Sequence, residues 1–386
     1  HEGAGYVHAV GKNVSKVAVG DKVILNWAIP CGQCFQCQEG NLHICETNSP
    51  VCGCELEGHA HIDSSLHNNN PIERSFHLGT MCEYAVVKAQ AVVKIDSNIS
   101  YQAASIVGCG VMTGWGSVVN AAKVHVGSSV CVIGCGGVGL NAIQGAKQSG
   151  ATKIIAIDIN EERLEQAKSF GATHGIIADK NDTDFVNVKA QVYALTNNRG
   201  ADYAFECTAI PALGSAPLTL TRNAGTAVQV SGIEQRIDFD CELFEWDKIY
   251  INPLYGMCNP ERDFARILAL YDNGTMKLDE LVTKTYTLET LAQGFGGKNP
   301  DRKAGPRIPR VNAVNPQGTD HAPFVLDHPS KGLNRLRIVP FLGVRLGDFG
   351  HMFRISTKHL VNFRGITQLE PRGGITGFGG AQPHDT

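Results

Sequence analysis

Short apolar runs alternate with segments of helical periodicity over the central part of this 386-residue chain. A strand–helix–strand rhythm is typical of right-handed crossovers, which place parallel strands side by side with helices on both faces of the sheet. The rhythm therefore predicts an α/β fold with a doubly wound parallel sheet of the Rossmann type. The apolar runs are Val130–Ile133, Lys153–Ile157, His174–Ile177, Asp202–Phe205 and Thr226–Val230.

A glycine-rich turn follows the first of these runs and opens a helix. Such glycines permit a tight turn and let backbone N–H groups approach a pyrophosphate at the helix N-terminus. Asp158 ends the next strand, and its carboxylate would accept hydrogen bonds from an adenosine ribose and repel a 2′-phosphate. We therefore expect NAD rather than NADP, a preference that the nearby Arg163 weakens slightly. The alternative is an α/β domain whose glycine turn binds nothing. The turn reads Gly134, Cys135, Gly136, Gly137, Val138, Gly139.

Four cysteines lie close together before the strand–helix region. Cys31, Cys34, Cys37 and Cys45 have the spacing C-x2-C-x2-C-x7-C. Four thiolates suit a tetrahedral Zn²⁺ with no open position, which makes such a site structural. An iron–sulfur cluster or disulfides are the alternatives. The x7 gap and the hydrophilic surroundings disfavour the iron–sulfur cluster.

Composition divides the chain near Phe295. Residues 296–386 hold 13 Lys and Arg against 6 Asp and Glu, whereas residues 1–295 hold 21 against 31 and contain all 13 cysteines. The basic charges of the last segment are scattered without a motif, so we expect no nucleic-acid partner. Apolar residues make up 43% of the chain, which favours a globular protein. The sequence has no apolar run long enough to span a membrane.

Several residues remain ambiguous on local pattern alone. A lone histidine such as His1 is usually solvated, and a lone cysteine such as Cys109 is usually inert packing. Asp202 and Glu206 lie at the ends of a strand and read as structural. Unpaired cysteines in such number suit a reducing compartment, so we expect a cytoplasmic protein.

The combination of motifs resembles the zinc-dependent medium-chain alcohol dehydrogenases, most of all their class-III-like, formaldehyde-linked branch. The resemblance covers roughly residues 2–295. It is carried by HEGAG, GDKVILNW, CGQCFQCQEGNLHIC, GCGVMTG, GCGGVG with AIDIN, NPERDF and LDELV, in this order along the chain.

The resemblance implies a set of site residues. In that family a cysteine, the histidine of a Gly-His-Glu motif and a second cysteine hold a catalytic zinc. The histidine corresponds to His1, its neighbour to Glu2 and the second cysteine to Cys109. Thr113 and Val138 fall where the family lines the nicotinamide site, and Trp27 falls where it lines the substrate pocket. The four-cysteine lobe at 31–45 would hold the structural zinc.

The resemblance also implies an organisation and an activity. We expect a GroES-like β domain over residues 1–110, a NAD-binding Rossmann domain over 111–275, and a return to the first domain over 276–295. Residues 296–386 depart from the family and are expected to be an atypical tail, disordered or frame-shifted. The family's first zinc cysteine and its proton relay precede the Gly-His-Glu motif, so we expect an N-terminally truncated chain with an incomplete catalytic zinc site.

The predicted function is hydride transfer between NAD and a primary alcohol, an aldehyde or a formaldehyde–thiol adduct. The family further implies a homo-oligomer and no membrane partner. One alternative is a non-catalytic protein that binds NAD and structural zinc. Another is a zinc-free reductase of the same superfamily, which the four cysteines disfavour.

Overall fold

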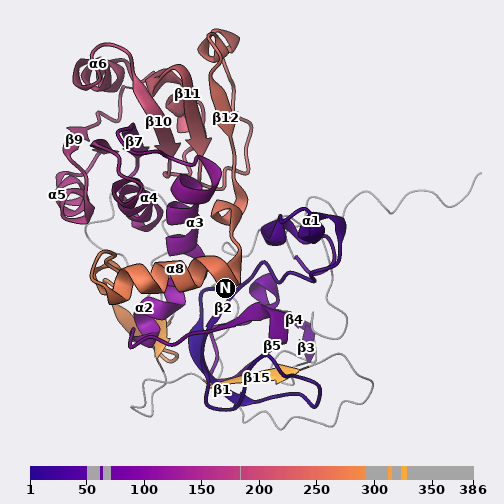
Figure 1. Cartoon of the computed structure of the whole chain (residues 1–386). Helices are drawn as coiled ribbons and strands as arrows, with labels where there is room; N and C mark the ends of the chain where they lie inside the picture. Colours follow the sequence, from indigo (N-terminus) through magenta and orange to yellow (C-terminus); the bar gives the residue numbers. More distant parts are fainter. Residues whose placement is uncertain (50–60, 64–70, 183, 292–311, 315–322, 328–386) are drawn as a thin grey trace, which may run out of the picture. The chain divides into compact units, whose positions relative to one another are not determined.

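The structure is a computed structural model that describes residues 1–49, 61–63, 71–182, 184–291, 312–314 and 323–327 (Figure 1). All of them belong to one compact unit, His1–Lys331. Most of the predicted tail, residues 296–386, lies outside the described residues, so its expected character stays a prediction.

The sheet with the most strands in this unit is parallel and has six strands. Its strand order is β12-β11-β10-β7-β8-β9, and every neighbouring pair is parallel. Strands β8 and β9 follow β7 on one side of the sheet, whereas β11 and β12 follow β10 on the other side. The carboxyl ends of β7 and β10 are therefore the switch point of a doubly wound sheet. The predicted fold is confirmed. The strands are β7 (Ser129–Ile133), β8 (Lys153–Asp158), β9 (His174–Ile177), β10 (Ala201–Glu206), β11 (Thr221–Gln229) and β12 (Ile249–Ile251).

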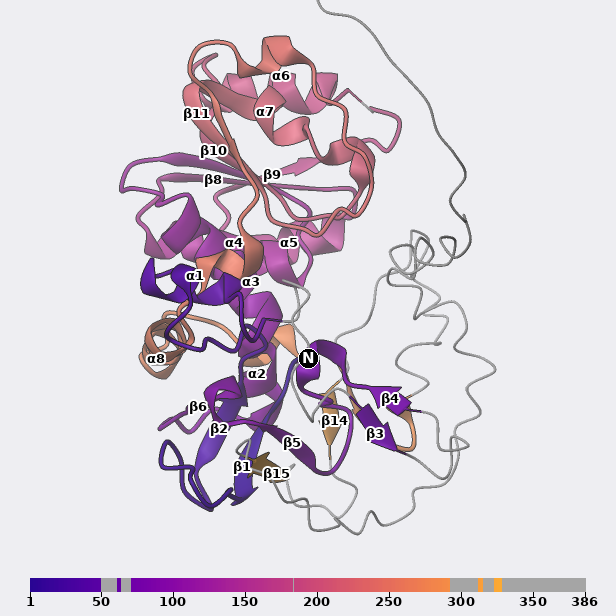
Figure 2. The same cartoon turned by 90° about the vertical axis from the view of Figure 1, so that its right-hand side faces the viewer.

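Helices cover both faces of this sheet (Figure 2). Alternate residues of one strand face opposite sides: Val130 and Val132 belong to the core that also contains α4 and α5, whereas Cys131 and Ile133 belong to a second core under α6 and α7. Because both faces are buried, the strands read as unbroken apolar runs. The helices are α4 (Gly137–Gln148), α5 (Glu161–Phe170), α6 (Val186–Leu195) and α7 (Ala216–Leu220).

A second sheet has the order β5-β15-β1-β2-β6. Strand β2 is antiparallel to β1 and β6, whereas β15 runs parallel to both β1 and β5. Residues 323–327, which we assigned to the tail, are therefore a strand of this sheet. The strands are β1 (Ala4–Ala9), β2 (Lys22–Leu25), β5 (Ala85–Lys88), β6 (Val92–Lys94) and β15 (Pro323–Asp327), beside two small pairs, β3 (His61–Asp63) with β4 (Pro71–Glu73) and β13 (Thr285–Thr287) with β14 (Asn312–Val314).

A continuous helical segment leads from the second sheet to the first. It begins at α2 (Tyr101–Ile106), capped by the Ser100 hydroxyl, and passes through a π-helical turn, Val107–Val111, into α3 (Met112–Gly116) and a further π turn, Ser117–Ala121. Turns of this kind are frequent at functional sites. The other helices are α1 (Phe35–Gln38) and α8 (Pro260–Asp272), with short 3-10 turns at Leu42–Ile44, Ser75–His77, Ala89–Ala91, Pro211–Leu213, Cys241–Phe244, Leu254–Met257 and Asp279–Leu281.

No helix within the described residues has both the length and the apolar character that crossing a membrane requires.

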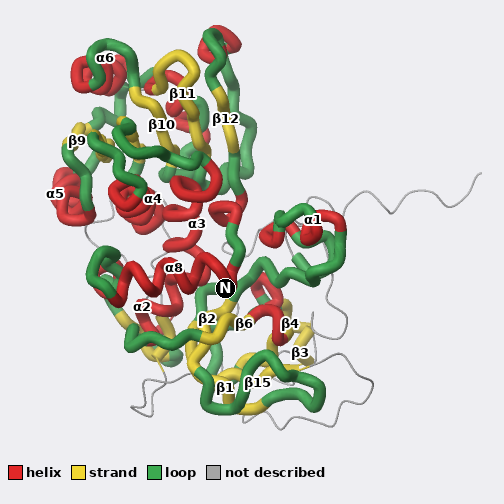
Figure 3. The backbone as a smooth tube through the Cα atoms, in the orientation of Figure 1, coloured by secondary structure: helices red, strands yellow, loops and turns green. Residues whose placement is uncertain are grey.

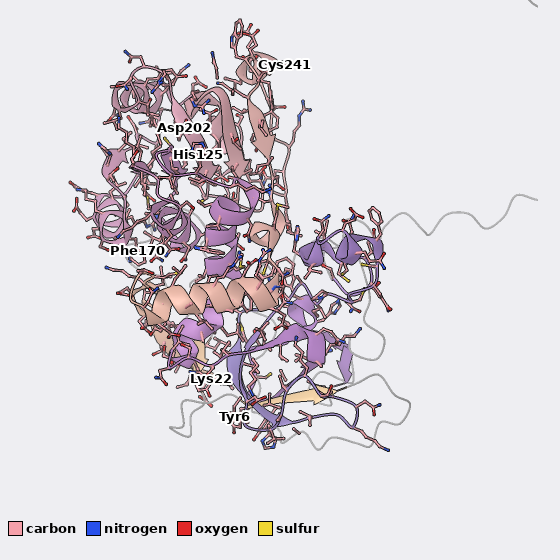
Figure 4. The ribbon with its side chains drawn as sticks, in the orientation of Figure 1. Tyr6, Lys22, His125, Phe170, Asp202 and Cys241 are labelled. Carbon is pink, nitrogen blue, oxygen red and sulfur yellow. The ribbon has the colours of Figure 1, made fainter. Side chains whose placement is uncertain are left out.

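Asp202, labelled in Figure 4, joins three strands at the amino ends of the first sheet. Its carboxylate accepts hydrogen bonds from the Ser129 amide (2.8 Å) and hydroxyl (2.7 Å) and from the Arg222 guanidinium (2.6 Å). Burial alone would raise the pKa of Asp202, but these hydrogen bonds and the Arg222 charge hold it below its ordinary value.

Asp202→Asn is therefore expected to lower the free energy of unfolding by about 1.5–3 kcal/mol at neutral pH, the usual contribution of a hydrogen bond to a charged group. A depressed folded-state pKa gives stability that is present above the unfolded-state pKa and lost as pH falls through the folded-state value. Urea unfolding of both proteins at several pH values should show their difference shrinking in acid. A difference independent of pH would contradict this role.

Candidate functional site

The glycine turn has the geometry of a dinucleotide cradle. Gly134 has φ +90°, and a Cβ on Gly139 would lie 1.9 Å from the Gly134 carbonyl oxygen, so both positions require glycine. At Gly136 a Cβ would meet no atom within 4 Å. The turn is therefore tightly packed at Gly139 and open at Gly136. On the open side, the amides at the start of α4 can meet an anion.

Asp158 binds the same turn from the end of β8. One carboxylate oxygen accepts the Cys135 amide at 2.8 Å, and the other accepts the Asn160 amide at 3.1 Å. The Arg163 guanidinium lies 3.7 Å from that second oxygen. The predicted dinucleotide residues thus meet at the carboxyl ends of β7 and β8, with an acidic group beside the turn.

His1 and Cys109, which are 108 residues apart in sequence, are in direct contact. The His1 Nε2 atom lies 3.0 Å from the Cys109 Sγ atom. A Zn²⁺ bound to both at a tetrahedral angle would separate these atoms by roughly 3.6 Å, so a small opening of the pair accommodates the metal. The Glu2 carboxylate accepts the Gly110 amide at 2.9 Å and fastens the start of β1 to the π-helical turn that carries Cys109.

Aromatic rings enclose this pair. Trp27 is 4% exposed and lies between Phe76 and Tyr255, with ring centroids 5.1 Å and 4.3 Å away. The His1 ring is 4.3 Å from Phe76 and 6.3 Å from Trp27. The Tyr255 hydroxyl donates to the Gly108 carbonyl, next to Cys109. These contacts form an apolar wall beside the candidate metal ligands.

The helix after Cys109 brings the two sites together. Thr113 follows Cys109 by one turn, and its carbonyl accepts the Ser117 hydroxyl at 2.7 Å. A Cβ on the next residue, Gly114, would lie 2.2 Å from the Val138 carbonyl oxygen, so α3 and the start of α4 are in backbone contact. The helix that carries Thr113 therefore packs directly on the glycine turn at Val138.

The four cysteines of the lobe form a separate cluster, whose chain is largely loop around α1 (Figure 3). The sulfur atoms of Cys31, Cys34, Cys37 and Cys45 all lie within 4.8 Å of one another, and those of Cys34 and Cys45 are 3.9 Å apart. Four sulfurs around a tetrahedral zinc are roughly 3.8 Å apart. The donor set and its size fit Zn²⁺, and the described cysteines are all free rather than disulfide-bonded.

Backbone amides point at these sulfurs. Cys31 Sγ accepts from the Gln33 and Cys34 amides (3.5 and 3.3 Å), and Cys45 Sγ accepts from the Cys31 and Asn48 amides (3.3 and 3.4 Å). Burial opposes ionisation of Cys31, but hydrogen bonds, chiefly from the Gln33 amide, lower its pKa to about 6. Burial raises the pKa of Cys37 to about 12. Amide donors of this kind stabilise thiolates, the form that binds metal.

Comparison with known proteins places this arrangement in a family. Residues 1–97 match the alcohol dehydrogenase GroES-like domain, and residues 137–268 match the zinc-binding dehydrogenase family. Alcohol dehydrogenase B of Mycobacterium tuberculosis is 33% identical over 318 residues, which cover 78% of this chain and 80% of the relative. The chain belongs to the zinc-dependent medium-chain alcohol dehydrogenases.

Further alcohol dehydrogenases extend the similarity. The NDMA-dependent alcohol dehydrogenase of Amycolatopsis methanolica is 33% identical over 312 residues, covering 78% of this chain and 81% of its own length. The crystal structure of benzyl alcohol dehydrogenase from Acinetobacter calcoaceticus has a TM-score of 0.64 at 29% identity, covering 76% of this chain and 78% of its own. The alcohol dehydrogenase family uses zinc and NAD(P), and the predicted enzyme class is confirmed.

Sequence reasoning missed the wall partners Phe76 and Tyr255. Tyr255 has φ +53° in a short kinked turn, which no local pattern predicts. Glu206, for which the sequence predicted a structural role, lies at the switch point of the alcohol dehydrogenase's parallel sheet and is 0% exposed.

Proposed function

We propose that this protein transfers hydride between NAD and a primary alcohol or aldehyde. The observation that carries the proposal is the backbone contact of α3 with α4, because it sets the His1–Cys109 pair beside the glycine turn. When bound, zinc would supply Lewis-acid polarisation of a substrate oxygen and the nicotinamide would accept or donate hydride. His1 and Cys109 would hold the catalytic zinc, and the four cysteines of the lobe would hold the structural zinc.

The residues of this chain provide orientation and exclusion of water. The amides at the start of α4 bind the pyrophosphate, and Asp158 disfavours a 2′-phosphate, which supports NAD over NADP. Trp27, Phe76 and Tyr255 form a bulky apolar wall that keeps water from the reacting atoms. A formaldehyde–thiol adduct is the alternative substrate, in keeping with the class-III-like resemblance.

Within the described residues, the lobe cysteines form a group of four candidate ligands that converge on one point, and the His1–Cys109 pair offers two further ligands. We expect the lobe to hold its zinc tightly, because four thiolates leave the metal no open position.

Zinc analysis, NADH titration and turnover of the full chain test this proposal together. We expect the lobe zinc to survive dialysis, NADH to bind, and a primary alcohol to be oxidised when zinc is supplied. A wild-type protein that binds no NADH would contradict the proposal. NADH binding without any turnover at saturating zinc would favour the non-catalytic alternative.

We propose that the protein is a homo-oligomer through the β12 edge of its parallel sheet. Trp246 and Ile249 are 70% and 53% exposed there, and Phe239, Phe244 and Tyr250 form an aromatic cluster beside them. An exposed apolar edge strand is a surface on which a second copy can pair.

The free cysteines further support a reducing, cytoplasmic location.

Trp246→Glu is expected to reduce the oligomer to a monomer, because it places a charge on the apolar edge. Sedimentation velocity measures the change in mass. Val126→Glu is the matched control, since Val126 is 80% exposed but lies just before β7, away from β12, and should leave the mass unchanged. A wild-type protein that sediments as a monomer would contradict the proposed interface.

A further inference from the structure

Glu206 is a buried carboxylate at the switch point of the parallel sheet. It is the last residue of β10, is 0% exposed, and pairs in register with Ile133 at the end of β7. Burying a carboxylate is unfavourable unless hydrogen bonds or a charge partner compensate. Within the described part of the chain, no Lys, Arg or His forms an ion pair with Glu206. Its compensation therefore comes from hydrogen bonds.

Both carboxylate oxygens of Glu206 are engaged by the loops that follow β10 and β11. One oxygen accepts from the Thr208 amide (2.5 Å), the Thr208 hydroxyl (2.5 Å) and the Ala209 amide (3.1 Å). The other accepts from the Ser231 hydroxyl. The Glu206 carbonyl also accepts the Val230 amide at 2.9 Å. Glu206 thus joins the loop after β10 to the loop after β11.

The loop that Glu206 holds borders the glycine turn. Ala209 has φ +60°, a left-handed conformation that is costly for a residue with a Cβ. The shape of this loop therefore depends on the surrounding hydrogen bonds. The Cys207 amide donates to the Ile133 carbonyl at 2.9 Å. A Cβ built on Gly134 would lie 2.7 Å from the Thr208 methyl group. The loop that carries Thr208 therefore packs directly against the glycine turn.

We propose that Glu206 is a positioning residue for the nicotinamide half of the dinucleotide. This rests on the proposed function. Asp158 places the adenosine half over β8, and the glycine turn places the pyrophosphate over β7. The remaining half must then extend across the switch point, over the carboxyl ends of β10 and β11. These are the ends whose loops Glu206 joins, and it acts on the cofactor through them rather than by contact.

Glu206→Gln tests the proposal with two ligands. The glutamine has the same shape and can still accept from the Thr208 and Ala209 amides, while the Ser231 hydroxyl can turn to accept. The hydrogen bonds become neutral and about half as strong. We expect the dissociation constant for NADH to rise on the order of 10-fold, while that for ADP-ribose, which lacks the nicotinamide, stays within about 2-fold of wild type. Fluorescence titration and calorimetry measure the two constants.

Asp202→Asn is the matched control, because it makes the same chemical change at the other end of β10, away from the glycine turn. It should lower stability without changing the ratio of the two dissociation constants. Equal weakening of NADH and ADP-ribose by Glu206→Gln would show a merely structural role and overturn the proposal, as would wild-type affinity for NADH.

A second pair of variants covers the case in which Glu206→Gln does not fold. Thr208→Val and Ser231→Ala each remove one hydroxyl donor and leave the carboxylate in place. Each should raise the ratio of the NADH constant to the ADP-ribose constant, and an unchanged ratio in both overturns the proposal. If the wild-type protein binds ADP-ribose but not NADH, or neither, it is the proposed function that fails.

Discussion

Gly136→Ala is expected to weaken NADH binding by roughly 10- to 100-fold without changing the melting temperature. Gly136 has φ −77° and ψ −172°, which alanine adopts freely, and a Cβ there would meet no protein atom within 4 Å. The protein therefore folds normally, but the added methyl group fills the space through which a pyrophosphate approaches the start of α4. One lost hydrogen bond to a charged group, contributing about 1.5–3 kcal/mol, accounts for a loss of this size.

NADH fluorescence titration together with thermal unfolding provides the measurement. Gly175→Ala on β9 is the control, because its Cβ would make ordinary contact with Leu164 at 3.6 Å and lies outside the turn. Gly139 is unsuitable, since a Cβ there clashes with the Gly134 carbonyl and would disturb the fold as well as the site. A folded Gly136→Ala protein that binds NADH like wild type would show that the turn is not the pyrophosphate site.

Cys45→Ser is expected to remove the tightly held zinc and unfold the lobe at residues 31–45. Cys45 is 0% exposed and its sulfur accepts two backbone amides. Serine lacks the soft thiolate, and zinc binding in small metal-folded units contributes roughly 10–16 kcal/mol. Losing a ligand should weaken zinc binding by at least about 100-fold, beyond the effect of losing an outer partner. Zinc per chain after dialysis, and the rate of chymotrypsin cleavage within the lobe after Phe35 or Leu42, report the two effects.

Cys241→Ser is the control for this substitution, because Cys241 is exposed and far from the lobe (Figure 4). It should keep the wild-type zinc content. The lobe turn Leu42–Ile44 contacts the turn Leu254–Met257 that carries Tyr255, so Cys45→Ser should also loosen the wall beside His1. Retention of a full zinc equivalent by Cys45→Ser would contradict the four-thiolate site.

Features of the protein with local sequence signals could be predicted before the structure was known. The apolar runs from Val130 onward predicted the parallel sheet because strands buried on both faces must be apolar throughout. The glycine turn could be found because Gly134 and Gly139 meet backbone constraints that another residue cannot satisfy. The cysteine cluster could be predicted because its four ligands all lie within residues 31–45.

Features that depend on contacts between distant segments became visible in the folded chain. His1 and Cys109 looked unremarkable in sequence and needed a family resemblance to be noticed, yet the fold brings them to 3.0 Å. Residues 323–327 had no strand signal that distinguished them from the tail, and their partners are β1 and β5. Glu206 acquires its role from two loops and a neighbouring turn. Such contacts arise from the packing of whole elements against one another, a property that no short stretch of sequence contains.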